Sequence, residues 1–253
     1  MMLYPNILFH FTDKMALFNI LEDSFKVSYA RERIKGQSSV REFAVPMVSF
    51  CDLRLSELKV HIEKYGKFGI GLTKDWAFRN GLNPVMYINE NSHFTDSFIK
   101  ALDGIFTMIN TLVENEYANK LTYDYLNVLN TYRYLKNYQG ELKRNNESII
   151  DYRFADEREW RLVPPISDKF NYMPFIPISK IKTKKEKDKF NLGISHIKLN
   201  FVPDDINYLI VDNDKEINPL IRHLQNVKNR YDQDTIDRLA SRILTSEQIK
   251  NDM

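Results

Sequence analysis

Short runs of apolar residues, broken by polar or glycine-containing segments, predict strands at both ends of the chain. The clearest runs are residues 7–11, 45–51 and 68–73. Runs of about four to eight apolar or aromatic residues bounded by turn-forming residues are typical of buried strands. The same reasoning predicts further strands over residues 85–88, 148–164, 197–202 and 208–211.

Helical spacing replaces this pattern in the middle of the chain. Between residues 97 and 138, apolar residues recur every three or four positions, which predicts a pair of amphipathic helices. Shorter helices are predicted over residues 53–65 and 235–244. Strands and helices follow each other without a regular rhythm, which favours an α+β fold over a doubly wound parallel sheet. We expect one α+β domain over residues 1–253, with mixed or antiparallel sheets, a helical insertion at residues 95–140 and C-terminal helices.

Two polar segments lack a clear period and are predicted to be loops. Residues 28–43 are polar and basic, and they are interpreted as a loop that covers a site. Residues 180–189 contain six lysines, which could meet phosphates or an acidic partner. A solvated loop is the more common structure for such a run, and it is the interpretation we favour here.

Composition narrows the class of protein. The chain has 253 residues, of which 43% are hydrophobic and 28% charged, so it can form a sizeable core without disulfides. Its single cysteine, Cys51, is typical of a reducing cytoplasm. We find no signal peptide and no stretch of about 20 apolar residues, so we expect no membrane span. A net charge of +2 gives nucleic-acid binding little support.

The most unusual motif is Glu157-Arg158-Glu159-Trp160-Arg161. In an extended strand, alternation would place Glu157, Glu159 and Arg161 on one face. If that face is buried, Arg161 or a ligand must compensate the two carboxylates, because an unpaired buried charge is costly. The alternative is an exposed edge strand with ordinary ion pairs, each contributing about 0 to 1 kcal/mol.

Other candidate residues lie near the predicted strands. The five histidines and Cys51 show no metal-ligand spacing, and no nucleophile motif surrounds Ser49. A carboxylate can bind sugar hydroxyls, a histidine can hydrogen-bond a second ribose, and a tyrosine can stack on a flat cationic ring. His10, Ser49, Tyr65 and Tyr87 therefore form, with the glutamate pair, a candidate ribose-binding set. Each could equally serve in the core or as an ion-pair partner.

Several ordered motifs carry a resemblance to a known family. They are His10-Phe11-Thr12 and the segments 46–52, 65–76, 81–85 and 157–161. Together these motifs resemble the AbiGi family of abortive phage resistance proteins, over most of the chain. This resemblance implies a bacterial anti-phage system in which the protein acts as an antitoxin beside a toxin or another protein of the same operon.

The same order of motifs is more distantly similar to the ADP-ribosyltransferases, in which an early His strand, a middle Ser or Tyr strand and a late Glu-x-Glu strand surround NAD. The resemblance implies an NAD site and a similar sheet core. It makes Glu159 the catalytic residue, with Glu157 and His10 beside it, and the cofactor-binding residues His10, Thr12, Ser49, Tyr65, Tyr87 and Arg161. Either Tyr65 or Tyr87 matches the stacking tyrosine. Two functions follow: an NAD-dependent enzyme of phage defence, or a non-catalytic antitoxin that antagonises a toxin.

Overall fold

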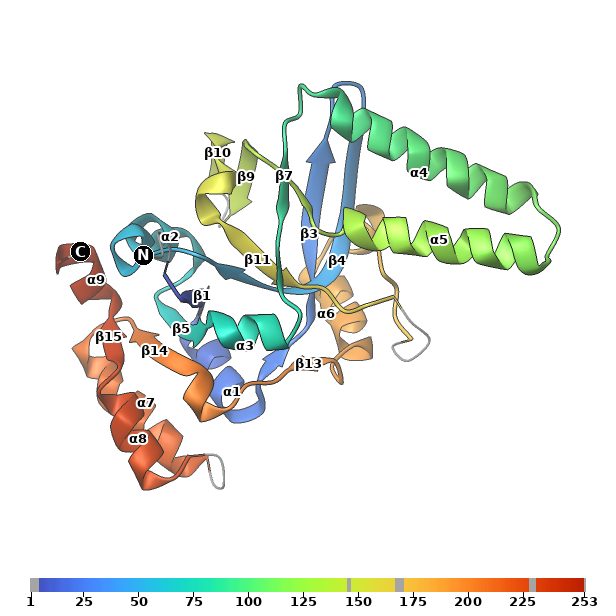
Figure 1. Ribbon diagram of the computed structural model, residues 1–253. Helices are drawn as coiled ribbons and strands as arrows, with labels where there is room; N and C mark the ends of the chain where they lie inside the picture. The colour runs from blue at the N-terminus through green and yellow to red at the C-terminus, as the bar shows by residue number, and fades with distance from the viewer. Residues whose placement is uncertain (1–4, 145–146, 167–170, 228–230, 253) are drawn as a thin grey trace.

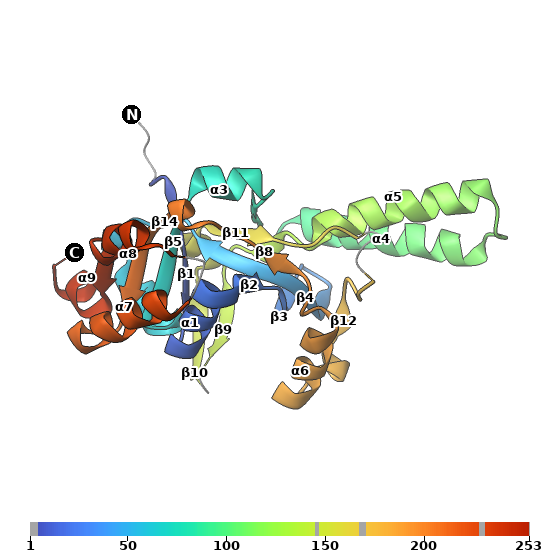
Figure 2. The same cartoon turned by 90° about the horizontal axis from the view of Figure 1, so that it is seen from below.

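The computed structural model describes residues 5–144, 147–166, 171–227 and 231–252. It has an α+β fold in which a mixed sheet carries helices around it and a long helix pair projects to one side (Figure 1). The view from below shows the same arrangement, with the helix pair at one end and the C-terminal helices at the other (Figure 2). The expected fold class is therefore present.

Over the described ranges, the main sheet has nine strands, in the order β15-β14-β5-β1-β4-β11-β6, with β3 and β12 also paired to β4. All of its pairs are antiparallel except β14 with β15. Its strands are β1 (Ile7–Thr12), β3 (Ser28–Lys35), β4 (Val40–Cys51), β5 (Phe68–Thr73), β6 (Asn83–Pro84), β11 (Glu159–Leu162), β12 (Ile176–Pro177), β14 (Ile206–Val211) and β15 (Ile243–Thr245).

Three two-stranded sheets and the helices complete the fold. The small sheets pair β2 (Phe25–Lys26) with β13 (Lys198–Leu199), β7 (Met86–Ile88) with β8 (Leu135–Asn137), and β9 (Gly140–Arg144) with β10 (Glu147–Tyr152). The α-helices are α1 (Lys14–Asp23), α2 (Leu58–Tyr65), α3 (Lys74–Arg79), α4 (His93–Thr111), α5 (Glu116–Tyr132), α6 (Lys184–Gly193), α7 (Ile217–Asn226), α8 (Gln233–Ala240) and α9 (Ser246–Asp252). Short 3-10 turns include η2 (Phe154–Glu157).

Strand β4 belongs to two parts of the sheet. Its first eight residues pair with β3, and two of them, Phe43 and Ala44, also pair with β12. Its last residues, from Val48 to Cys51, pair with β11, and Cys51 also pairs with Phe9 of β1. Within the described residues, Phe9 with Cys51 is the only pair that β1 and β4 share.

The glycines of β5 make room for aromatic rings on β1. Gly71 lies opposite Phe9, and Gly69 lies opposite Phe11. A Cβ atom at Gly71 would be 2.8 Å from the ring of Phe9, closer than side chains pack. The glycines thus allow the phenyl rings of the neighbouring strand to approach β5 closely.

Hydrophobic side chains fill three clusters. The largest packs the sheet against α1, α3, α7 and α8 and includes Leu17, Trp76 and Leu220. A second lies under the base of the helix pair. A third, around Phe9 and Ile62, packs β1 against α2 and α9.

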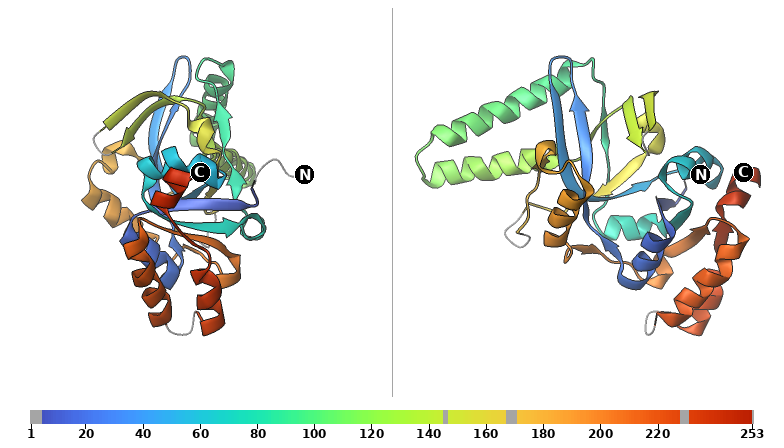
Figure 3. Two further views of the ribbon diagram at one scale, coloured as in Figure 1. Left: turned by 90° about the vertical axis from the view of Figure 1, so that its left-hand side faces the viewer. Right: turned by 180° about the vertical axis from the view of Figure 1, so that it is seen from behind.

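The helix pair of α4 and α5, which we call the arm, extends beyond the rest of the chain (Figures 1 and 3). It connects β7 to β8, which pair in parallel. Its base is well buried through Ile99, Leu102 and Tyr132, and near its free end Ala118 is buried as well. Within the described residues, no helix has both the length and the apolar composition to cross a membrane.

Both segments predicted to be loops are regular structure. Residues 28–43 form the hairpin of β3 and β4, in which Arg33 lies opposite Glu42 and forms an ion pair with it at 3.2 Å. Cross-strand pairs of opposite charge stabilise such a strand despite its polar sequence. The lysine segment continues into α6, which begins with a capping box formed by Thr183 and Glu186.

Candidate functional site

Strands β1, β4 and β11 lie side by side and carry the three predicted motifs. Glu159 is paired with Cys51, and Arg161 with Ser49, so these side chains share one face of the sheet. His10 is one position beyond Phe9, the partner of Cys51, so its side chain leaves β1 on the opposite face. The structure therefore places Ser49 and Glu159 on one face of the sheet and His10 on the other, and all three residues line the same cleft.

His10 is tied to β4 through the backbone. Its Nδ1 atom lies 2.8 Å from the carbonyl oxygen of Ser49, and its ring packs edge-on against Phe25. Burial lowers the pKa of His10, although the bond to the Ser49 carbonyl opposes this shift. The imidazole is thus neutral near pH 7, with Nδ1 as the donor and Nε2 left as an acceptor.

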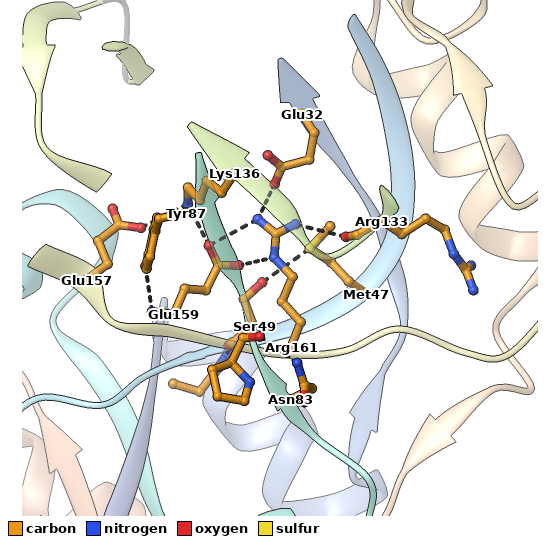
Figure 4. Close-up of polar contacts among 12 residues, drawn as sticks. Glu32, Met47, Ser49, Asn83, Tyr87, Arg133, Lys136, Glu157, Glu159 and Arg161 are labelled. Carbon is orange, nitrogen blue, oxygen red and sulfur yellow. Dashed lines mark hydrogen bonds and ion pairs between the residues drawn. The ribbon is translucent and has the colours of Figure 1, made fainter. Parts of the chain in front are cut away.

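Glu159 is held by two cations (Figure 4). Its Oε1 accepts from Nε of Arg161 at 2.5 Å, and its Oε2 accepts from Nη2 of Arg161 at 3.1 Å and from Nζ of Lys136 at 2.6 Å. Arg161 also donates to Glu32 at 2.7 Å and to the Arg133 carbonyl at 3.1 Å. Burial disfavours the charge on Glu159, but Arg161 and Lys136 outweigh it and hold the pKa of Glu159 well below its usual range.

Glu157 lies beside Glu159 but on a different element. It ends η2, and Arg158 then adopts a left-handed conformation with φ of 44° before β11 begins. Glu157, Glu159 and Arg161 are nevertheless all buried on one side, while Arg158 and Trp160 are half-buried. The prediction of a shared face with Arg161 as a charge partner is therefore confirmed, although the strand starts two residues later than expected.

Lys136 joins the two carboxylates. Its Nζ donates to Glu157 at 3.0 Å and to Glu159 at 2.6 Å. The hydroxyl groups of Tyr65 and Tyr152 donate to the other oxygen of Glu157. Burial disfavours the charge on Lys136, yet the neighbouring carboxylates raise the pKa of Lys136 well above its usual value. The amine is charged at any physiological pH.

The two candidate tyrosines occupy different positions. Tyr65 lines the cleft, and its ring stacks on His61 with centroids 4.2 Å apart. Tyr87 does not line the cleft; its hydroxyl accepts the backbone N–H of Glu159 at 2.8 Å. Burial raises the pKa of Tyr87 to about 12. Tyr65 is thus the candidate for contact with a ligand, and Tyr87 positions β11 from behind.

These residues surround a cleft of about 1130 Å³. It is lined by His10, Thr12, Ser49, Tyr65, Glu157 and Glu159 among the predicted residues, whereas Arg161 lies beneath Glu159. Charged side chains of β3 and the β9–β10 hairpin, such as Arg33 and Lys143, form its rim. The volume slightly exceeds the range of about 300–1,000 Å³ that is usual for small-molecule sites.

Sequence reasoning missed Lys136, Tyr152 and Glu32. Lys136 was hidden because residues 95–140 were predicted to be helical, whereas α5 ends at Tyr132. In the structure Lys136 lies in β8 between buried Leu135 and Asn137, an alternation that three residues of sequence do not reveal.

The predicted lysine segment lies apart from the cleft, because the lysines of α6 do not line it. Among the described residues, no group of three or more His, Cys, Asp or Glu side chains is placed to hold a metal ion. The cleft is lined by carboxylates, hydroxyl groups, basic side chains and the two imidazoles of His10 and His61.

Comparison with known proteins gives two matches. Residues 13–212 match the family model described as “Putative abortive phage resistance protein AbiGi, antitoxin”. The chain is also 28% identical, over 238 residues, to the abortive phage resistance protein AbiGi of Lactococcus lactis subsp. cremoris, covering 86% of this chain and 92% of that protein. No solved structure matches the chain.

Proposed function

The chain belongs to the AbiGi family of abortive phage resistance proteins, and we propose that it acts in anti-phage defence by binding NAD in the cleft between β1, β4 and β11. The observation that carries this proposal is that Ser49, Glu157, Glu159 and His10 all line one cleft, with His10 bonded to the backbone of Ser49. NAD would supply an ADP-ribosyl group joined to a nicotinamide leaving group.

The carboxylates retain the capacity to bind ribose. An ionised carboxylate has about four acceptor positions. Glu159 uses three of them for Arg161 and Lys136, and Glu157 uses three for Lys136, Tyr65 and Tyr152. Each therefore keeps one position for a donor such as a sugar hydroxyl. Because Lys136 and Arg161 already compensate their charge, a neutral hydroxyl suits the pair better than a second cation.

Other residues of the cleft fit the same ligand. Among the described residues, the Ser49 hydroxyl bonds only to the Met47 sulfur, at 3.3 Å, which is a weak acceptor. The hydroxyl can therefore turn to a stronger partner. His10 offers an acceptor nitrogen for the second ribose, with Thr12 beside it, and Tyr65 provides an aromatic ring at the carboxylate end.

In this proposal Glu159 is the catalytic residue. It would accept a ribose hydroxyl and, as an ionised group in a water-poor site, stabilise the positive charge that develops at the sugar when the nicotinamide bond weakens. Arg161, Lys136 and Tyr87 would hold its carboxylate and backbone in place.

The test is NAD binding by calorimetry, followed by incubation with labelled NAD and cell extract. We expect Glu159→Gln to abolish label transfer and NAD loss, and Ser49→Ala to weaken NAD binding without unfolding the chain. Glu57→Gln is the matched control, because Glu57 is a carboxylate bonded to Arg158 at the surface. No NAD binding by the folded wild-type protein would contradict the proposal.

A second candidate is a non-catalytic antitoxin, favoured by the word antitoxin in the family description. In that case the network around Glu159 would only maintain the fold, and the protein would act by binding a toxin. A folded protein that neither binds nor consumes NAD, but forms a stable complex with a protein encoded beside it, would favour this function.

A further inference from the structure

The arm carries exposed apolar side chains along one side of α4. Phe94, Phe98, Ile105 and Met108 of α4 are separated by four, seven and three positions, so they follow one stripe along the helix, and Leu112 caps its C-terminal end. Phe94 is 46% exposed and Met108 is 50% exposed, while the other three are half-buried. We call this set the α4 stripe.

The stripe adjoins the seam between the two helices, because Phe98 stacks on Tyr132 of α5 with ring centroids 5.7 Å apart, whereas Phe94 and Met108 stay exposed. Buried Ile99 and Leu102 lie on a neighbouring face of α4, towards the base of the arm, in one cluster with Tyr132 of α5. Further out, Phe106 contacts Tyr125 of α5, with ring centroids 5.7 Å apart. The apolar sector of α4 is thus wider than α5 can cover, as expected for a helix that packs on two sides.

The arm carries a net negative charge. Residues 93–132 contain five acidic and two basic residues, a net charge of −3, whereas the whole chain has a net charge of +2. Asp96 and Asp103 are used internally, since Asp96 accepts the N–H of Gln37 and Asp103 pairs with Arg41. Glu114 and Glu116, near the free end, and Asp124, midway along α5, have no ion-pair partner among the residues that the structure describes.

We infer that the arm is a docking surface for a partner protein that presents an amphipathic helix with a basic edge. A stripe of apolar side chains on one helix can pack against the apolar face of another helix. Exposed Phe and Met side chains make effective contacts in such an interface. The unpaired acidic residues of the arm favour a partner helix that carries basic residues along one edge. A second copy would bring its own acidic arm against this one, and nucleic acid or an anionic membrane would be repelled by the same charges.

This inference is independent of NAD binding, and a peptide assay tests it with the full chain. The probes are two synthetic helices of about five turns, each with leucine along one face and either lysine or glutamate elsewhere, measured by fluorescence anisotropy. We expect the lysine peptide to bind roughly tenfold more tightly than the glutamate peptide. Replacing Glu114, Glu116 and Asp124 with their amides should remove this preference.

Substitutions in the stripe complete the test. Phe94→Asp and Met108→Asp should each weaken binding of the lysine peptide by roughly tenfold or more. Val60→Asp is the matched control, because Val60 is 55% exposed on α2, away from the arm. Equal binding of both peptides, or binding unaffected by the two stripe variants, would overturn the inference. So would a dimer in sedimentation that Met108→Asp dissociates, since the occupant would then be a second copy.

Discussion

The cleft and the arm distribute charge and apolar surface in opposite ways. At the base of the cleft, Glu159 and Arg161 are buried, with the side chain of Arg161 wholly inaccessible, and Lys136 beside them is 14% exposed. On the arm, Met108 and Val113 are at least half exposed. Buried charges need fixed partners and exposed apolar side chains do not, so the first region is rigidly specified and the second is free to accept an external partner.

The largest effect should come from breaking the charge network. Replacing Arg161 with Met leaves Glu159 and Glu32 without their shared guanidinium in a buried site. We expect a loss of about 3–5 kcal/mol in the free energy of unfolding, measured with urea. Arg158→Met, which removes a half-exposed pair with Glu57, should cost less than about 1 kcal/mol. Equal losses would show that the network contributes no more than a surface pair.

The arm should divide into a structural base and a dispensable surface. Leu102→Ala removes a side chain that is 2% exposed and should lower the free energy of unfolding by about 2–5 kcal/mol. Met108→Ala, six residues further along α4, should change it by no more than about 0.5 kcal/mol. Chemical denaturation of both variants measures the difference. A large loss from Met108→Ala would mean that its side chain supports the fold.

Acidification should weaken the stabilisation that the buried Glu159 gives to the cleft. The pKa of Glu159 is depressed in the folded protein, so its contribution to stability is present above the unfolded pKa, about 4.3, and is lost as the pH falls towards the folded value. The difference in unfolding free energy between wild type and Glu159→Gln should therefore shrink below about pH 4.3, by at most about 1.4 kcal/mol per pH unit. A constant difference would contradict the depressed pKa.

Some of the fold and the site could be predicted because local pattern decides it. Residues 7–11 and 68–73 have continuous apolar character, and both form central strands. The alternation of Glu157, Glu159 and Arg161 correctly predicted one buried face, because side-chain period survives even where η2 replaces the strand. Those features depend on neighbours along the chain.

Other features depend on distant partners and could not be predicted in this way. The polar hairpin at residues 28–43 is stabilised by pairs such as Arg33 with Glu42, which a local pattern does not reveal. Residues 243–245 form a strand, where helix was expected, because they can add to the edge of the sheet beside β14. Lys136 gained its role only when β8 brought it to two carboxylates from elsewhere in the chain.

The parallel pairing of β7 and β8 makes the arm a topological requirement of the cleft. Parallel neighbours need a crossover connection of about a dozen residues or more, which a tight turn cannot provide. The arm is that crossover, and β8 carries Lys136. Trimming the arm to a short loop would therefore prevent the pairing of β7 with β8 that places Lys136. Any shortened version of this protein must keep enough residues between the two strands for the chain to return to the start of β7 before β8 begins.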